Sequence, residues 1–332
     1  MSEDGTTPSQ PLAAGVVGVG SMGRNHARVY DELGTTRLAG VYDADRDRSE
    51  SVASEFDTSA RKVDALLDVV DVVSIAVPTE YHFELARRAV HAGVDVLVEK
   101  PFVEDIDRGR ALVRLADQHD VAIQIGHVER FNPTVSVLRD IVEELEVIAV
   151  DGKRLGPPPE RRIPDSAVMD LMIHDVDLVW SLLDGSVDTC SGYQTADGRH
   201  AVGTLEFDTD TLCTLTASRV SREEVRRISV SAKECRVTAD LLEQTVEVHR
   251  KSDPEYASGE VADCRGGEVV EQVSVADDEP LERELRSFTR TVLEDGTPTV
   301  SGEEGLRVLE MTRAIEEATD RQTAEQLSFA SD

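Results

Sequence analysis

Short apolar runs alternate with helical patterns between residues 14 and 127, and this alternation constrains the fold more than any other feature. The apolar runs fall at 15–19, 37–42, 69–77, 94–99 and 121–127. Helical patterns lie between them, at 22–33, 46–56, 80–92 and 105–119. Near-continuous apolar strands that alternate with helices are typical of a parallel sheet covered on both faces. We therefore predict a doubly wound α/β domain here.

The pattern changes after an expected helix at 133–144. Strands then follow one another along the chain, at 147–155, 187–195, 201–207, 211–219 and 225–232. Short connections between them predict a large, mostly antiparallel sheet. Flanking helices are expected at 168–183, 280–294 and 302–319, the last with Ser301 as its N-cap and Glu304 in a capping box. This half is therefore predicted to be an α+β domain.

The length of 332 residues fits two domains of about 150 residues each. We expect a disordered tail at 1–11, a nucleotide-binding domain at 12–127, a substrate-binding and oligomerisation domain at 128–320, and a frayed tail at 321–332. The closing helices can pack back on the first domain. With no linker of low complexity, we expect the active site in a cleft between the domains.

Charge and composition exclude several classes of function. The formal net charge is −31, which opposes binding to nucleic acid or to an anionic membrane. No apolar run approaches the about 18 residues of a membrane span, and the acidic start is unlike a signal peptide, so we expect a soluble cytoplasmic protein. The four cysteines are widely spaced, which predicts neither a disulfide nor a metal site. The abundance of carboxylates and the scarcity of lysine resemble proteins of extreme halophiles.

The first strand ends in a glycine-rich turn, Gly18-Val-Gly20-Ser-Met-Gly23, that opens a helix. This spacing allows a tight turn, a close approach of the backbone to a pyrophosphate, and close packing of helix on strand. Asp43 lies 20 residues further on, at the end of the second run, where a carboxylate binds the ribose diol of NAD and repels the 2′-phosphate of NADP. We predict an NAD-binding Rossmann domain, although Arg46 and Arg48 leave NADP open.

Two further segments carry groups suited to alcohol oxidation. Glu99-Lys100-Pro101 closes the run at 94–99 and places a lysine at the carboxyl edge of the sheet, where it can stabilise an alkoxide. On the helix expected at 168–183, Asp170, His174 and Asp177 share one face by i, i+4 and i, i+3 spacing. A histidine oriented by a carboxylate can accept a hydroxyl proton as hydride leaves.

Together these motifs resemble the Gfo/Idh/MocA (glucose–fructose oxidoreductase and inositol dehydrogenase) family over about residues 12–320. Pro78-Thr79 with His82, and the closing segment 296–310, also match. The resemblance implies that Lys100, Asp170 and His174 are catalytic, and that the antiparallel sheet forms a homodimer or homotetramer through an uncovered apolar face. It places the following residues at the cofactor: Gly18, Gly20, Ser21, Met22, Gly23, Asp43, Pro78, Thr79, His82, Glu99 and Lys100.

Within the family, segments 126–133 and 170–177 are most similar to the branch of UDP-N-acetylglucosamine 3-dehydrogenases, which oxidise the sugar 3-hydroxyl with NAD. A diphosphate favours charge-assisted hydrogen bonds, for which Arg130, Lys153, Arg154, Arg161 and Arg162 are candidates. The full set expected at the substrate is Lys100, His127, Arg130, Asn132, Lys153, Arg161, Asp170 and His174. Ser166–Met169 departs from the glycine common in relatives before the catalytic aspartate, so the substrate-side loop is expected to differ in shape.

Three alternatives stay open at this point. An inositol or simple-sugar dehydrogenase of the same family would need no diphosphate site. A glycosidase that uses NAD transiently would return the hydride and release no NADH. A non-catalytic sensor of NAD or sugar would need none of Lys100, Asp170 and His174.

Overall fold

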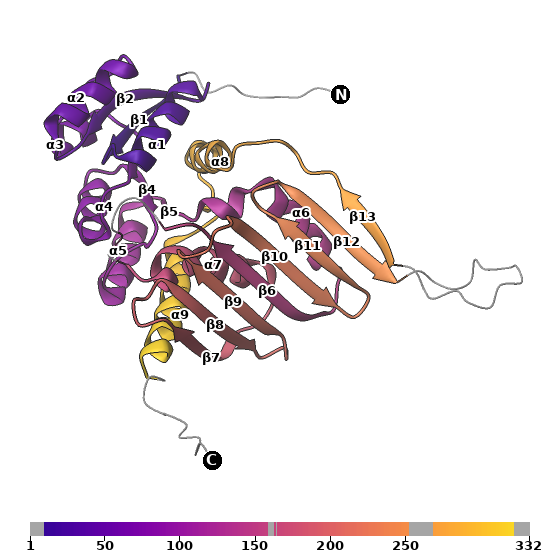
Figure 1. Ribbon diagram of the computed structural model, residues 1–332. Coiled ribbons are helices and arrows are strands. Elements are labelled where there is room, and N and C mark those ends of the chain that lie inside the picture. Colours follow the sequence, from indigo (N-terminus) through magenta and orange to yellow (C-terminus); the bar gives the residue numbers. More distant parts are fainter. Residues whose placement is uncertain (1–9, 159–162, 164, 252–267, 322–332) are drawn as a thin grey trace, which may run out of the picture. The chain divides into compact units, whose positions relative to one another are not determined.

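The computed structural model describes residues 10–158, 163, 165–251 and 268–321 (Figure 1). The chain divides into two compact units. The first comprises Met1–Val128 with Glu279–Leu309, and the second comprises Glu129–Asp278 with Glu310–Asp332. The chain therefore returns to the first unit near its end, and helix α9 (Gly302–Arg321) begins in one unit and ends in the other. The expected tails lie almost entirely outside the described residues.

The first unit contains a five-stranded parallel sheet in the order β2-β1-β3-β4-β5, which confirms the doubly wound fold. Its strands are β1 (Leu12–Val17), β2 (Thr36–Tyr42), β3 (Val72–Ile75), β4 (Asp95–Glu99) and β5 (Ile123–Gly126). Its helices are α1 (Ser21–Glu32), α2 (Arg46–Glu55), α3 (Val63–Leu67), α4 (His82–His91), α5 (Ile106–His119) and α8 (Pro280–Glu294), with a 3₁₀ turn η1 at Thr79–Tyr81. The strand order reverses between β1 and β3, and doubly wound folds bind ligands at the carboxyl ends of the strands beside such a reversal.

Helix α8 completes the core on one face of this sheet. It begins with Pro280 at a first-turn position, where the missing N–H costs no hydrogen bond. Leu285 and Phe288 are fully buried in one cluster with Val29 and Tyr30 of α1. The first unit therefore needs a segment from residue 280 onward to cover its sheet. The sequence allows closing helices to pack back on the first domain in this way.

The second unit is built on an eight-stranded sheet in the order β13-β12-β11-β10-β6-β9-β8-β7. Only β6 and β9 pair in parallel, so the mostly antiparallel sheet is confirmed. The strands are β6 (Val147–Leu155), β7 (Val187–Gln194), β8 (His200–Phe207), β9 (Leu212–Ser218), β10 (Val225–Ala232), β11 (Cys235–Asp240), β12 (Thr245–Lys251) and β13 (Glu268–Val273). A 3₁₀ turn η2 (Val128–Phe131) leads into α6 (Pro133–Val142), and α7 (Ile173–Leu182) follows β6.

Helices α6 and α7 pack on one face of this large sheet, while the other face carries no helix among the described residues of the unit (Figure 1). A row of small polar side chains crosses that open face, strand by strand: Ser191, Thr204, Thr214, Asp151, Ser229 and Thr238. Ser191 and Thr204 share a hydrogen bond of 2.6 Å between their hydroxyl oxygens. This row is polar, but Tyr193 and Leu212 lie on the same face and are 63% and 50% exposed. The face is therefore mixed, and the expectation of an uncovered apolar face stays a prediction. The oligomeric state stays a prediction.

The start of the helix expected at 168–183, which carries Asp170 and His174, differs from the sequence prediction. The helix expected at 168–183 begins with a π-turn, η3 (Val168–Met172), and becomes α-helical only at Ile173. Such wider turns are rare and occur frequently at functional sites. None of the described helices combines the length and the apolar character that a membrane crossing needs.

Candidate active site

The glycine-rich turn after β1 has the geometry that a pyrophosphate requires. Gly18 has a φ of +89°, and a Cβ there would lie 2.6 Å from the carbonyl oxygen of Ala76. A Cβ on Gly23 would lie 1.7 Å from the carbonyl oxygen of Gly18, whereas a Cβ on Gly20 would meet no described atom within 4 Å. The first and third glycines therefore permit the turn and the close packing of α1. The second leaves open space beside the N-terminus of α1, which favours an anion.

Asp43 follows β2 and is bonded directly to this turn. Its carboxylate accepts hydrogen bonds from the backbone N–H of Val19 at 2.9 Å and of Asp45 at 2.8 Å. Arg48 lies 3.3 Å from both carboxylate oxygens, and Arg46 pairs instead with Glu50 at 2.7 Å. Both arginines that left NADP open are thus paired with carboxylates of the chain. Asp43 also holds the shape of the turn, a function that the sequence did not predict.

Glu99 belongs to a buried polar chain behind Lys100. One carboxylate oxygen of Glu99 lies 3.0 Å from Nε2 of His26, and Nδ1 of His26 lies 3.0 Å from the hydroxyl of Ser74. Tyr30 extends this series of hydrogen bonds, because its hydroxyl lies 2.8 Å from that of Ser74. Burial raises the pKa of Glu99, but the hydrogen bond and charge of His26, with the charge of Lys100, outweigh it and hold the pKa below its ordinary value. Glu99 is therefore bonded within the chain directly before Lys100, and its expected contact with the cofactor stays a prediction.

His82 ties together the loops that follow β3 and β4. Its Nε2 lies 2.8 Å from the carbonyl oxygen of Val77, and its Nδ1 lies 3.0 Å from that of Pro101. The side chain is buried, and burial lowers its pKa although the carbonyls favour the protonated ring. His82 therefore braces the turn that carries Lys100, and its expected contact with the cofactor stays a prediction.

The first unit thus gathers most of the expected cofactor residues at the carboxyl ends of β1 to β4. Pro78 is exposed and Thr79 is partly exposed where η1 begins, beside the glycine turn, and Ser21 and Met22 are exposed in the first turn of α1. Lys100 is partly exposed directly after β4. His127, expected at the substrate, is buried directly after β5.

In the second unit, Asp170 lies in the π-turn and His174 lies in the first turn of α7, and both are partly exposed. Arg219, which follows β9, donates from Nη2 to Oδ2 of Asp170 at 2.7 Å. Asp177 is instead completely buried, with an oxygen 2.8 Å from Nη2 of Arg130. Asp177 is therefore part of the core, although its spacing placed it on the face of Asp170 and His174.

Three residues expected at the substrate have structural partners. Arg130 is 5% exposed and bonds to Asp177 through Nε at 3.0 Å. Arg154 is buried between Asp175, at 3.0 Å, and Glu129, at 2.8 Å. Asn132 caps α6 by accepting from the N–H of Thr134, and its amide donates to the carbonyl oxygen of Leu241. Buried charges must be paired, and the structure pairs both arginines within the chain. The assignment of Arg130 and Arg154 to a diphosphate, and of Asn132 to the substrate, therefore stays a prediction that these contacts do not support.

Lys153 is exposed, but its side chain lies on the other face of the sheet from α7. Residues alternate between faces along a strand, and the neighbouring Arg154 contacts Asp175 of α7. Lys153 therefore lies on the open face with Asp151, away from Asp170 and His174, and this position does not support its expected contact with the substrate. Arg161 and Arg162 lie outside the described residues.

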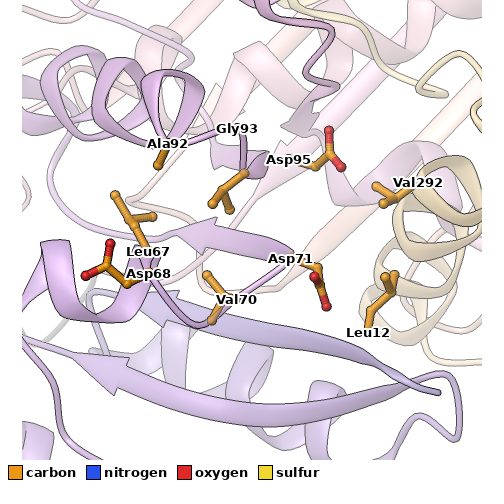
Figure 2. Close-up of a pocket in the computed structure, with 10 residues that line it drawn as sticks. Leu12, Leu67, Asp68, Val70, Asp71, Ala92, Gly93, Asp95 and Val292 are labelled. Atoms are coloured by element: carbon orange, nitrogen blue, oxygen red, sulfur yellow. The ribbon is translucent and has the colours of Figure 1, made fainter.

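A pocket of about 580 Å³ lies at the opposite edge of the parallel sheet (Figure 2). Leu12, Asp71 and Asp95 mark the beginnings of β1, β3 and β4 there. Asp71 accepts a hydrogen bond from the N–H of Ala13, and Asp95 accepts one from that of Ala122, both at 2.7 Å. These carboxylates satisfy backbone groups where neighbouring strands begin, so the pocket is a structural feature apart from the glycine turn.

The glycine turn, Asp43 and the lysine at the sheet edge define a dinucleotide-binding oxidoreductase domain. The family model of oxidoreductases with an NAD-binding Rossmann fold matches residues 12–127, and that of the GFO/IDH/MocA C-terminal domain matches 146–238. The chain belongs to the Gfo/Idh/MocA family of oxidoreductases.

Several relatives resemble the chain over most of its length. The UDP-N-acetylglucosamine 3-dehydrogenase of Acidithiobacillus ferrooxidans is 33% identical over 306 residues, which are 90% of this chain and 94% of that protein. A solved structure of this enzyme, GnnA, has a TM-score of 0.88 at 31% identity and covers 95% of this chain and 100% of its own. The myo-inositol dehydrogenase Hyg17 of Streptomyces leeuwenhoekii is 31% identical over 229 residues, 63% of this chain and 70% of that protein.

Proposed function

We propose that this chain is an NAD-dependent dehydrogenase that oxidises the 3-hydroxyl of a UDP-N-acetylhexosamine to a ketone. The observation that carries the proposal is the relationship to the Acidithiobacillus ferrooxidans enzyme, at 33% identity over 90% of this chain. Retention of Lys100, Asp170 and His174 supports a catalyst over a non-catalytic sensor.

The cofactor preference is proposed from the end of β2. Asp43 presents a carboxylate beside the turn that would hold the pyrophosphate, and Arg48 and Arg46 are paired with acidic side chains. A 2′-phosphate would meet the negative charge of Asp43 and find these cations engaged. We therefore propose NAD rather than NADP.

The chemistry divides between the cofactor and three side chains. Bound NAD supplies the hydride acceptor. His174 accepts the proton of the sugar hydroxyl, and Asp170 orients and stabilises the charged imidazole. Lys100 stabilises the negative charge that develops on the sugar oxygen. The Gly18–Gly23 turn and Asp43 orient the cofactor, so that much of the barrier is removed by positioning.

A second candidate, oxidation of an inositol or a free sugar, is favoured by one structural observation. Arg130, Lys153 and Arg154, the described cations first assigned to the diphosphate, are either buried in ion pairs or on the far face of the sheet. The nucleotide part of the substrate is thus supported by the relationship alone.

The test is NADH absorbance at high salt with NAD and a panel of UDP-N-acetylhexosamines, inositols and free hexoses. Turnover selective for a UDP-N-acetylhexosamine, with a 3-keto product by mass spectrometry and NMR, is expected. Turnover with inositols or free sugars alone would keep the cofactor and the catalytic residues but overturn the substrate. Consumption of a glycoside without accumulation of NADH would indicate the transient-redox glycosidase instead.

A further inference from the structure

Arg219 holds the carboxylate of Asp170 and the chain that leads to it. Residues 213, 215 and 217 of β9 are buried on the side of the sheet that faces the π-turn, and Arg219 continues this alternation just after the strand. Its side chain is 7% exposed. The guanidinium therefore lies within the fold, beside one of the proposed catalytic residues.

Three hydrogen bonds define what this guanidinium does. Nη2 donates to Oδ2 of Asp170 at 2.7 Å and to the carbonyl oxygen of Ser166 at 3.1 Å, and Nη1 donates to the carbonyl oxygen of Asp165 at 2.7 Å. The two carbonyls belong to the segment that enters the π-turn. One planar group thus fixes both the backbone before the turn and a carboxylate within it.

The same segment is tied down from its other side. The hydroxyl of Ser166 donates to Glu316 of α9 at 2.5 Å and accepts from the N–H of Met169 at 3.1 Å. The side chain of Ser166 and the guanidinium of Arg219 together fix the segment that enters the π-turn.

Resting on the proposed function, we infer that Arg219 is a positioning residue for the reaction and acts through Asp170. Charge-assisted hydrogen bonds are short and directional, and a guanidinium holds its donors in a fixed fork that an ammonium does not reproduce. Arg219 restricts rotation of the Asp170 carboxylate and keeps it oriented for the proton transfer. Displacement of a catalytic group by about 1 Å costs about 100-fold in rate.

The experiment is a double-mutant cycle on kcat. Wild type, Arg219→Met, Asp170→Asn and the double variant are compared with NAD and the best sugar of the panel. Arg219→Met is expected to lower kcat about 100-fold and to leave KM for NAD unchanged. The loss caused by Asp170→Asn is expected to shrink to within about twofold in the Arg219→Met background, because the two residues act as one unit.

Two further variants separate positioning from folding. Arg219→Gln keeps amide donors for the carbonyls but lacks the charge. It replaces Arg219→Met in the double-mutant cycle if Arg219→Met does not fold. The matched control is Arg227→Met, which removes a half-exposed arginine paired with Asp240 and is expected to leave kcat unchanged. Thermal unfolding of every variant identifies losses that come from unfolding.

The outcomes distinguish this inference from the proposed function. Independent, multiplicative losses for Arg219 and Asp170, or an unchanged kcat in both Arg219 variants, would overturn the inference while the wild type still turns over. Absence of turnover by the wild type with every sugar would overturn the proposed function, and the inference with it.

Discussion

Arg154→Met should destabilise the second unit strongly without impairing substrate binding. Arg154 bonds Glu129 at 2.8 Å and Asp175 at 3.0 Å, and the three side chains are each less than 10% exposed. Removing the cation leaves two buried carboxylates. Glu129 then keeps Arg226 at 3.6 Å and the amide of Asn132 at 3.3 Å as neighbours among the described residues. Breaking a buried pair in this way costs about 3–5 kcal/mol. For a domain of this size, this corresponds to a Tm lower by about 6–20 °C.

The pH dependence gives this prediction a sign. In the wild type burial raises the pKa of Glu129, but the charge and hydrogen bond of Arg154 outweigh it and hold the pKa below its ordinary value of 4.5. Glu129 therefore adds stability above that pH, which is lost as pH falls through the folded pKa. Burial raises the pKa of Asp175 even with Arg154 in place, although the charge of Arg154 opposes this. Without Arg154, burial also raises the pKa of Glu129 above its unfolded value and raises that of Asp175 further. The penalty is then present at neutral pH and is relieved as pH falls, so the gap between variant and wild type narrows toward pH about 5.

The assay is thermal unfolding at constant high salt, at pH about 8 and pH about 5.5, with Arg227→Met as the control. The control removes an exposed pair, which contributes about 0–1 kcal/mol. Kinetics well below the Tm should show an unchanged KM for the sugar. A Tm within about 3 °C of the wild type, joined to a tenfold or larger rise in that KM, would refute the structural role and return Arg154 to the substrate.

Three further predictions follow from the first unit and from the charge of the chain. Lys100→Met should lower kcat at least about 100-fold by removing charge at the developing oxyanion, while NAD affinity by fluorescence titration stays within about twofold; unchanged turnover would exclude the assignment. Asp43→Asn, which retains an acceptor for the N–H of Val19 at 2.9 Å, should raise KM for NAD and relax the NAD/NADP preference about tenfold, and an unaltered ratio would contradict the ribose contact. With a net charge of −31, the protein should gain Tm as KCl rises from low to molar concentration, and a flat response would contradict self-repulsion as a major destabilising factor.

The parallel sheet was predictable because its strands are apolar on both faces and its helices are regular. The same reasoning missed β11 and β12, since Val237 and Ala239, or Val246 and Val248, alternate with polar and charged residues and form no continuous apolar run. It also missed the π-turn. A single wider turn leaves no trace in a 3.6-residue periodicity when the residues on both sides remain helical.

The candidate site divides in the same way. Glycine spacing and strand ends are local signals, so the turn at Gly18–Gly23 and the place of Lys100 could be predicted. The partner of a buried arginine cannot be predicted from local sequence. Arg130 and Arg154 pair with carboxylates that lie 47 and 21 residues away in the sequence. Two signals went unused: His26 interrupts an apolar helical stripe, and Arg219 continues the inward alternation of β9.

The most direct test of the central claim is to follow deuterium from carbon 3 of the sugar. UDP-N-acetylglucosamine labelled with deuterium at that carbon is incubated with the enzyme and NAD, and both products are analysed by mass spectrometry. We expect deuterated NADH and an unlabelled 3-keto sugar in equal amounts, with neither formed by Lys100→Met. Deuterium retained in the sugar while NADH accumulates would show that another carbon is oxidised and would contradict the account.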